Sequence, residues 1–210
     1  TQHVVDTINR GEIHIVEPDL DILVKSAVQA GNLTASLEPT KADIFILAVP
    51  TPFRDGHEPD LSYVETATKM ITPYVEPGNL VILESTSPVG TTDGIVARIL
   101  KENGCDTDKD VYVAHCPERV LPGRILVELV QNDRIVGGIN EVSTEQAVEF
   151  YNTFVSGEVL STDARTAELA KLTENSFRDV NIAFANELSL ICDQEGISVW
   201  ELIKLANRHP

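Results

Sequence analysis

Four short apolar runs divide the first two thirds of the chain, and turns and segments with helical periodicity separate them. The runs are DIFILAV (43–49), LVILES (80–85), VYVAH (111–115) and RIVGG (134–138). A continuous apolar run of this length is typical of a strand that is buried on both faces of a sheet. Strands that alternate with helices at this spacing predict right-handed crossover units and a parallel sheet.

Helical periodicity is present before, between and after these strands. In the second predicted helix, Pro18 suits the first helical position and Gly31 suits a C-terminal stop. The predicted helices before the last third of the chain cover approximately residues 3–11, 18–30, 61–74 and 143–154, and a further one follows the turn TSPVGTT (86–92) and runs to about residue 103. They provide the flanking layers that a parallel sheet requires.

From about residue 163 the alternation stops, and one helical run continues to residue 195 before Gly196 ends it. This run of roughly 30 residues corresponds to a helix of about 45 Å. Its apolar residues lie on more than one side, so we expect it to pack against a second subunit or another domain. A shorter helix is predicted from about Ser198. The predicted fold class is therefore α/β: the remainder of a Rossmann-type parallel sheet with flanking helices, followed by a long central helix.

The composition excludes several classes of protein. Acidic residues outnumber basic ones by 33 to 16, and the net charge of −17 disfavours nucleic acid as a partner. No apolar run is long enough to span a membrane. The three cysteines form neither a disulfide framework nor a zinc pattern, so we expect no metal and a reducing cytoplasm. Cys105, Cys116 and Cys192 are interpreted as buried structural thiols.

One face of the long helix carries Lys171, Asn175 and Arg178, which fall within about 60° of arc. A lysine beside an amide can move a proton and orient a water or hydroxyl, and an arginine can bind a carboxylate or phosphate. These residues are therefore candidates for a catalytic face. A solvated stripe, with Glu174 and Arg178 paired one turn apart, is the alternative.

Three turns follow predicted strands, at the edge where parallel sheets bind ligands. In AHCPERVLPGR (114–124), Glu118 is a candidate general base and Arg119 a candidate ligand cation, although a plain surface turn is equally compatible. In ESTSPVGTT (84–92), backbone N–H groups at a helix start can face an anion or a ribose. In AVPTPF (48–53), Thr51 lies at the tip of the turn.

Taken together, these segments resemble the UDP-glucose/GDP-mannose dehydrogenase family over essentially the whole chain. The segments that carry the resemblance are NRGEIHIVEPDL (9–20), AVPTPF, ESTSPVGTT, CPERVLPGR, AELAKLTENSFRDVNIAFANELSLIC (167–192) and WELIKLANRHP (200–210). Three of them, STSPVG, CPERVLPG and KLTENSFRDVN, are long and specific.

The resemblance implies an NAD-dependent enzyme that oxidises the C6 alcohol of a UDP-sugar to a carboxylate in two hydride transfers. PERVLPG favours UDP-N-acetyl-D-mannosamine over UDP-glucose as the substrate. The family resemblance implies that the product is a building block of a surface polysaccharide. Lys171 would be the acid/base that stabilises an oxyanion, Asn175 would orient water, and Glu118 would activate it. Thr51 and Thr86 would contact NAD. The residues expected to bind the UDP-sugar are Arg119, Val120, Lys171, Asn175, Arg178 and His209.

The same resemblance implies a homodimer through the helix around residues 165–195. It assigns residues 1–162 to an NAD-binding domain truncated at its start, and residues 163–210 to a central dimerisation region truncated at its end. The sequence contains no GxGxxG loop and no GGHC segment with the family's nucleophilic cysteine. We therefore expect this chain alone to be inactive.

Three alternatives remain open from the sequence. In the first, the substrate would be another UDP-sugar such as UDP-glucose. In the second, the chain would be related to 6-phosphogluconate or hydroxyacid dehydrogenases, which also place a lysine and an asparagine one turn apart. In the third, the chain would be a non-catalytic dimerisation or interaction fragment.

Overall fold

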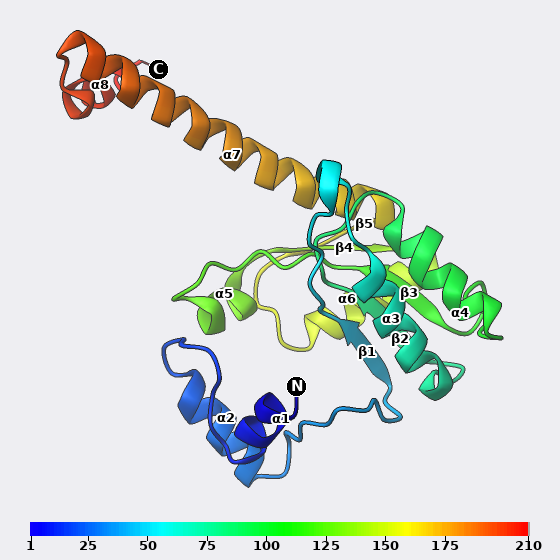
Figure 1. Ribbon diagram of the computed structural model, residues 1–210. Coiled ribbons are helices and arrows are strands. Elements are labelled where there is room, and N and C mark those ends of the chain that lie inside the picture. Colours follow the sequence, from blue (N-terminus) through cyan, green and yellow to red (C-terminus); the bar gives the residue numbers. More distant parts are fainter. Residues whose placement is uncertain (210) are drawn as a thin grey trace. The chain divides into compact units, whose positions relative to one another are not determined.

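A computed structural model describes residues 1–209 and divides the chain into two compact units, Thr1–Leu169 and Ala170–Pro210. The first unit contains a five-stranded sheet (Figure 1). Its strands are β1 (Ile44–Leu47), β2 (Leu80–Leu83), β3 (Tyr112–His115), β4 (Arg134–Gly138) and β5 (Val159–Asp163). Its helices are α1 (Gln2–Asn9), α2 (Leu20–Gln29), α3 (Ser62–Ile71), α4 (Arg98–Glu102), α5 (Ile125–Gln131) and α6 (Glu141–Asn152). Helix α7 (Ala164–Glu195) begins in the first unit and ends in the second, which also contains α8 (Val199–Ala206).

The strands lie in the order in which they occur in the chain, from β1 to β5. Strands β1, β2 and β3 are parallel, and their last residues, Leu47, Leu83 and His115, are aligned. Strand β4 is antiparallel to β3 and parallel to β5. The turns that follow β1, β2 and β3 therefore meet at one edge of the sheet, as the sequence predicted.

Two apolar clusters fill the space on either side of the sheet because successive strand residues point to opposite faces. Val81 and Leu83 belong to the cluster that includes buried residues of α3 and α4. Leu80 and Ile82 belong to the cluster that includes buried residues of α6. Helices α3 and α4 thus cover one face and α6 covers the other (Figure 1).

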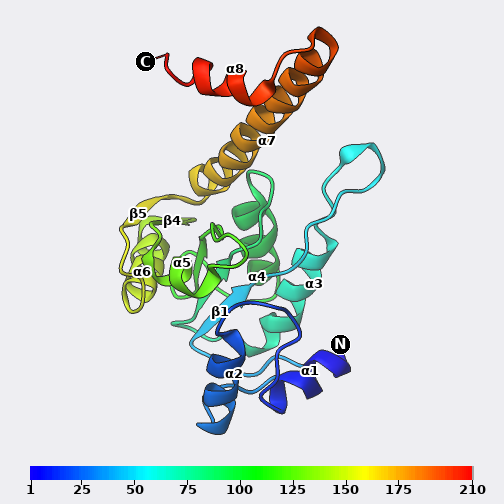
Figure 2. The same ribbon diagram turned by 90° about the vertical axis from the view of Figure 1, so that its left-hand side faces the viewer.

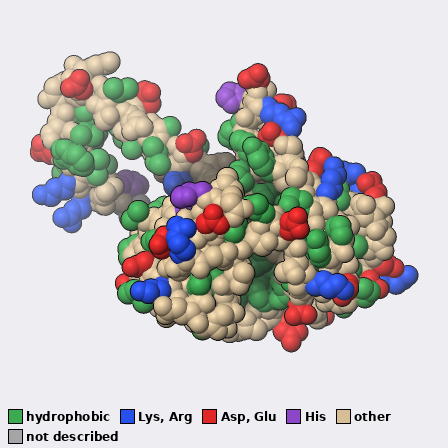
Figure 3. All heavy atoms as spheres, turned by 60° about the horizontal axis from the view of Figure 1, so that its bottom comes forward, with side chains coloured by type: hydrophobic (Ala, Val, Ile, Leu, Met, Phe, Trp, Pro, Cys, Tyr) green, Lys and Arg blue, Asp and Glu red, His purple; other side chains and the backbone are tan. Residues whose placement is uncertain are grey.

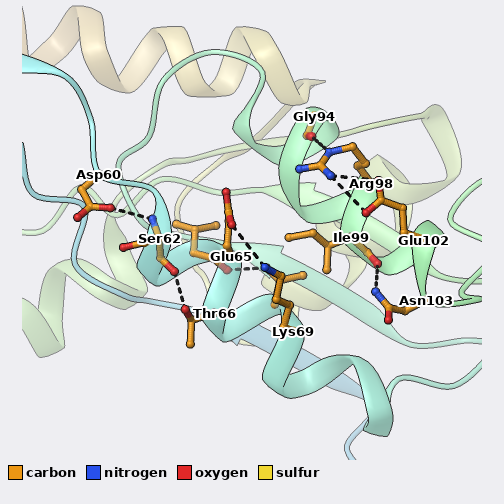
Figure 4. A network of polar contacts seen from close by, with 12 residues as sticks. Asp60, Ser62, Glu65, Thr66, Lys69, Gly94, Arg98, Ile99, Glu102 and Asn103 are labelled. Carbon is orange, nitrogen blue, oxygen red and sulfur yellow. Dashed lines mark hydrogen bonds and ion pairs between the residues drawn. The ribbon is translucent and has the colours of Figure 1, made fainter.

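The outer faces of α3 and α4 carry local polar contacts (Figure 4). Asp60 accepts a hydrogen bond from the Ser62 backbone N–H at 3.0 Å, just as α3 begins. In α4, Arg98 pairs with Glu102 at 3.1 Å. Exposed pairs of this kind contribute only about 0.3–0.5 kcal/mol. The buried faces, rather than these contacts, therefore hold both helices on the sheet.

Helices α1 and α2 lie side by side in both ribbon views (Figures 1 and 2). The Asn9 side chain fixes the segment after α2, because it accepts from the Ala35 N–H at 2.8 Å and donates to the Ala35 carbonyl at 3.0 Å. Asp19, with a φ of 63°, precedes the first residue of α2. Pro18 therefore lies before the helix and does not open it, which corrects the prediction from the sequence.

Charged side chains of both signs are interspersed over the face of the first unit that Figure 3 shows. Among residues 1–209, no helix combines the length and apolar character needed to cross a bilayer. In the same described range, no group of three or more His, Cys, Asp or Glu side chains is arranged to hold a metal ion.

The predicted α/β class and the long helix are confirmed. Two features differ from the prediction. The sequence did not indicate β5, whose residues are partly or fully exposed. The connection from β3 to β4 is not a crossover: α5 has no buried residue, so it does not form a layer on the sheet, and β4 returns antiparallel to β3.

The burial of His115 gives the fold a defined dependence on pH. His115 is fully buried at the end of β3, and burial lowers its pKa to about 4 from an ordinary value of 6.5. The unfolded chain therefore takes up a proton near pH 6.5, whereas the folded chain does so only near pH 4. We expect the free energy of unfolding to be unaffected by this group above pH 6.5 and to fall by about 3 kcal/mol between pH 6.5 and 4.

Denaturant titrations of the protein and of His115→Leu, each at several pH values, measure this effect. The difference in the free energy of unfolding between the protein and the variant should be constant above pH 7. Below pH 6.5 the free energy of unfolding of the protein should fall relative to that of the variant. Parallel curves over the whole range would contradict the assignment.

Candidate functional site

The turns after β1 and β2 are joined by hydroxyl groups. The Ser85 hydroxyl accepts from the Val49 N–H and donates to the Val49 carbonyl, both at 2.7 Å. The Thr51 hydroxyl donates to the Thr86 carbonyl at 2.7 Å. The two threonines predicted to contact NAD therefore lie together, and both are half-buried.

These threonines are compatible with a dinucleotide at this edge. Thr51 retains an acceptor on its hydroxyl after it donates to Thr86. Within the described residues the Thr86 hydroxyl makes no hydrogen bond. Two half-buried hydroxyls in the turns that follow neighbouring parallel strands fit the position where such sheets bind nucleotides.

The helical segment Thr92–Ala97 lies between β2 and α4, and its start is occupied by a carboxylate of the chain itself. Glu168, at the beginning of α7, is 1% exposed. It accepts from the Gly90 N–H at 2.5 Å, the Thr92 N–H at 2.8 Å and the Thr92 hydroxyl at 2.7 Å. The sequence suggested that N–H groups here face an anion, and these two N–H groups do so, but the anion is Glu168.

The turn after β3 presents Glu118, the predicted base. One carboxylate oxygen accepts from the N–H groups of Arg119 at 2.6 Å and Val120 at 3.0 Å. The other oxygen lies 3.2 Å from the guanidinium of Arg134. The Glu118 side chain is 34% exposed, so it is reachable from solvent although its orientation is fixed.

Arg119 and Val120, the next two residues, are half-buried. The Arg119 guanidinium donates to the Asp133 carbonyl at 3.1 Å. With Asn132 and Asp133 it lines an open pocket of about 310 Å³. The predicted ligand cation is thus placed at a cavity at this edge.

Behind Glu118 lies a buried polar group that the sequence did not indicate. The Tyr151 hydroxyl donates to Glu84 at 2.6 Å, and the Arg134 guanidinium lies over the Tyr151 ring, 5.5 Å from its centre. Burial raises the pKa of Glu84 above its ordinary value, although the hydrogen bond from Tyr151 opposes this. Cys116 is fully buried nearby, and burial raises the pKa of its thiol to about 11. Cys116 is therefore protonated at neutral pH and is a structural residue, as expected.

The other two cysteines differ from one another. Cys192 is buried, as predicted, whereas Cys105 is only partly buried. None of the three forms a disulfide in the described structure.

Two acidic side chains hold the turn that contains Glu118. Glu17, which is 6% exposed and comes from the segment between α1 and α2, accepts from the N–H groups of Gly123 at 2.9 Å and Ile125 at 2.8 Å. Glu128 of α5 accepts from the Leu121 N–H at 2.8 Å. Two carboxylates therefore fix the part of the turn that follows Val120.

The remaining predicted residues belong to the second unit. Lys171, Asn175 and Arg178 occupy successive turns of α7, and Lys171 is half-buried while the other two are exposed. His209 is exposed and follows α8. The helix that the sequence predicted is present, and it places the lysine, the amide and the second cation on one face.

Comparison with known protein families gives matches to two domain models of one family. Residues 1–155 match the model for the NAD binding domain of the UDP-glucose/GDP-mannose dehydrogenase family, and residues 165–210 match the model for its central domain. The chain spans about half the length of the curated relatives that it matches.

Two examples among the curated relatives show the similarity over the whole chain. UDP-N-acetyl-D-mannosamine dehydrogenase of Escherichia coli (strain K12) is 59% identical over 217 residues, covering 100% of this chain and 51% of its own. NDP-N-acetyl-D-galactosaminuronic acid dehydrogenase of Ralstonia nicotianae is 57% identical, with coverage of 100% and 51%.

Solved structures with similar folds include dehydrogenases named for the same sugar nucleotide as the first of these relatives. The UDP-N-acetyl-mannosamine dehydrogenase Cap5O from Staphylococcus aureus superposes with a TM-score of 0.94 at 45% identity, covering 100% of this chain and 52% of that one. A UDP-D-ManNAc dehydrogenase from Pyrococcus horikoshii gives a TM-score of 0.92 at 46% identity, with coverage of 99% and 50%.

Proposed function

We propose a function from the premise that this chain belongs to the UDP-glucose/GDP-mannose dehydrogenase family. The full-length enzyme oxidises the C6 alcohol of a UDP-sugar to a carboxylate with NAD, and the sugar nucleotide is UDP-N-acetyl-D-mannosamine. The observation that carries the proposal is the 59% identity, over the entire chain, to a UDP-N-acetyl-D-mannosamine dehydrogenase. We assign residues 1–162 to the NAD-binding domain and 163–210 to the central region.

The proposed roles follow the chemistry of each side chain. Bound NAD supplies the hydride acceptor, and the hydroxyls of Thr51 and Thr86 hold it at the carboxyl ends of β1 and β2. Lys171 moves the proton of the sugar hydroxyl and stabilises negative charge on its oxygen. Asn175 orients water, and Glu118 accepts its proton.

The UDP-sugar is bound by charged, polar and apolar groups. A guanidinium suits a diphosphate or a sugar carboxylate because it donates two parallel hydrogen bonds. The place of Arg119 in the lining of a pocket of about 310 Å³ supports this role. The proposed binding residues are Arg119, Val120, Lys171, Asn175, Arg178 and His209.

We further propose that the enzyme is a homodimer through α7. Large apolar side chains are exposed on α7 and α8, and a helix with apolar residues on several sides requires a partner. The most exposed of these side chains are Phe177, Val180, Phe184, Trp200 and Leu205. A cytoplasmic location and a role in surface polysaccharide synthesis complete the proposal.

The test is an assay of the full-length enzyme for NADH production with three substrates: UDP-N-acetyl-D-mannosamine, UDP-N-acetyl-D-galactosamine and UDP-glucose. We expect the first to give the highest kcat/KM and two NADH for each sugar oxidised. A preference for the second would favour the function named for the Ralstonia relative, and no turnover with any would refute the proposal.

Sedimentation equilibrium on the same preparation tests the dimer, which a monomer at micromolar concentration would contradict.

A further inference from the structure

Arg134 opens β4, and its side chain is almost completely enclosed. The residue is 2% exposed. Its guanidinium pairs with Glu118 at 3.2 Å and donates to the Leu129 carbonyl at 3.3 Å. A buried cation is costly unless it is paired, and breaking such a pair leaves the remaining charge without compensation. The side-chain ion pair of this buried cation is therefore made with the proposed base.

The charge of Arg134 is maintained despite its burial. Burial lowers the pKa of the guanidinium. The negative charges around it, of which Glu118 contributes most, raise the pKa by more than burial lowers it, so the net shift is upward. The ring of Tyr151 lies against the guanidinium, and the Tyr151 hydroxyl is itself fixed by Glu84. The position of Arg134 is thus determined by the Tyr151 ring as well as by Glu118.

The contacts of Glu118 account for most of its acceptor sites. An ionised carboxylate offers about four lone-pair directions. The N–H groups of Arg119 and Val120 use two of them, and Arg134 uses a third. Within the described residues, one direction remains on the oxygen that faces Arg134. A water molecule that is to lose a proton to Glu118 would approach along that direction.

We infer that Arg134 is a positioning residue for Glu118: it fixes the carboxylate so that a single lone pair is presented to the attacking water. The inference rests on the proposed function, in which Glu118 activates water. A purely structural role, in which Arg134 only joins β4 to the carbonyl of Leu129, is the competing explanation.

The experiment uses the full-length enzyme with Arg134→Met, Arg134→Lys, Glu118→Gln and the double variant Arg134→Met/Glu118→Gln. The control is Arg165→Met, which removes an exposed arginine paired with Asp93 at 2.9 Å. For Arg134→Met we expect kcat to fall about 100-fold, because a misplaced catalytic group can cost that much, with KM for the sugar changed less than threefold. Arg134→Lys should recover part of the loss, and Arg165→Met should behave as wild type.

Two further readouts separate positioning from structure. In rapid-mixing experiments the initial burst of NADH should persist in Arg134→Met while the steady-state rate falls, because only the water step depends on Glu118. In the double variant, Arg134→Met should add less than a twofold loss to that of Glu118→Gln, since a residue that acts only through Glu118 has no effect without it.

The outcomes test the role of Arg134 and the proposed function separately. Additive losses in the double variant, or a burst that falls together with the steady-state rate, would overturn the inference while leaving the proposed function intact. If wild type itself oxidises no UDP-sugar, the proposed function fails instead. If Arg134→Met does not fold, the same cycle is run with Arg134→Lys, where a loss of about tenfold that vanishes in the Glu118→Gln background is expected.

Discussion

Replacing Lys171 by methionine is expected to lower the kcat of the full-length enzyme by about 10²–10⁴-fold. This range is typical for the loss of a general acid/base or of a cation that stabilises an oxyanion. Methionine retains most of the length and apolar stem of lysine but carries no charge and no proton.

Steady-state NADH production with UDP-N-acetyl-D-mannosamine measures this effect, together with the melting temperature as a check on folding. The matched control is Lys69→Met, because Lys69 is an exposed helical lysine whose ion-pair partner is Glu65 at 3.5 Å. It should retain wild-type activity. A Lys171→Met enzyme with more than a tenth of the wild-type kcat would remove Lys171 from the mechanism.

The second large effect is on stability. A methyl group added at Gly137 in β4 would lie 2.2 Å from the Asp163 carbonyl oxygen and 2.8 Å from the Ala164 nitrogen. Both are backbone atoms, at the end of β5 and the start of α7, so no side chain can rotate away. We expect Gly137→Ala to destabilise the protein by about 3 kcal/mol or more, because overpacking of this kind forces backbone shifts.

For a protein of this size, a loss of this magnitude corresponds to a decrease in Tm of roughly 6–12 °C. Calorimetry or thermal circular dichroism of Gly137→Ala measures it. Gly94→Ala is the control, since Gly94 is exposed in the helical segment Thr92–Ala97 and an added methyl group there meets no atom of another part of the chain within 4 Å. That variant should be neutral or more stable by up to about 1 kcal/mol. Equal melting temperatures for the two variants would show that β4 and β5 can separate without cost.

The strands of the sheet could be predicted where burial on both faces left an apolar run. β2 is buried at every residue, and its boundaries follow from LVILES with little error. β5 shows no such run, because VLSTD lies at the edge of the sheet and is partly or fully exposed. The antiparallel direction of β4 depends on the course of the connection from β3 to β4, and local sequence does not encode that.

Some contacts of the candidate site could likewise be predicted from the sequence and others could not. Thr51 and Thr86 could be expected to meet, since both follow neighbouring parallel strands. Glu17 and Arg134 could not, because their partners are 106 and 16 residues away in the chain and local periodicity carries no information about such contacts. Glu168 was predicted to lie on the long helix, yet its contact with the turn after β2 depends on the packing of the first unit.

The enclosed carboxylates of Glu17 and Glu168 alter how this acidic chain responds to ionic strength. Dissolved ions screen exposed charges beyond about 10 Å at 0.1 M, and exposed pairs such as Lys109 with Asp106 are weakened by them. Glu17 and Glu168 are bound by backbone N–H groups and lie out of contact with the electrolyte. The connections that fix the turns after β2 and β3 therefore persist in concentrated electrolyte, while repulsion across the acidic surface is relieved.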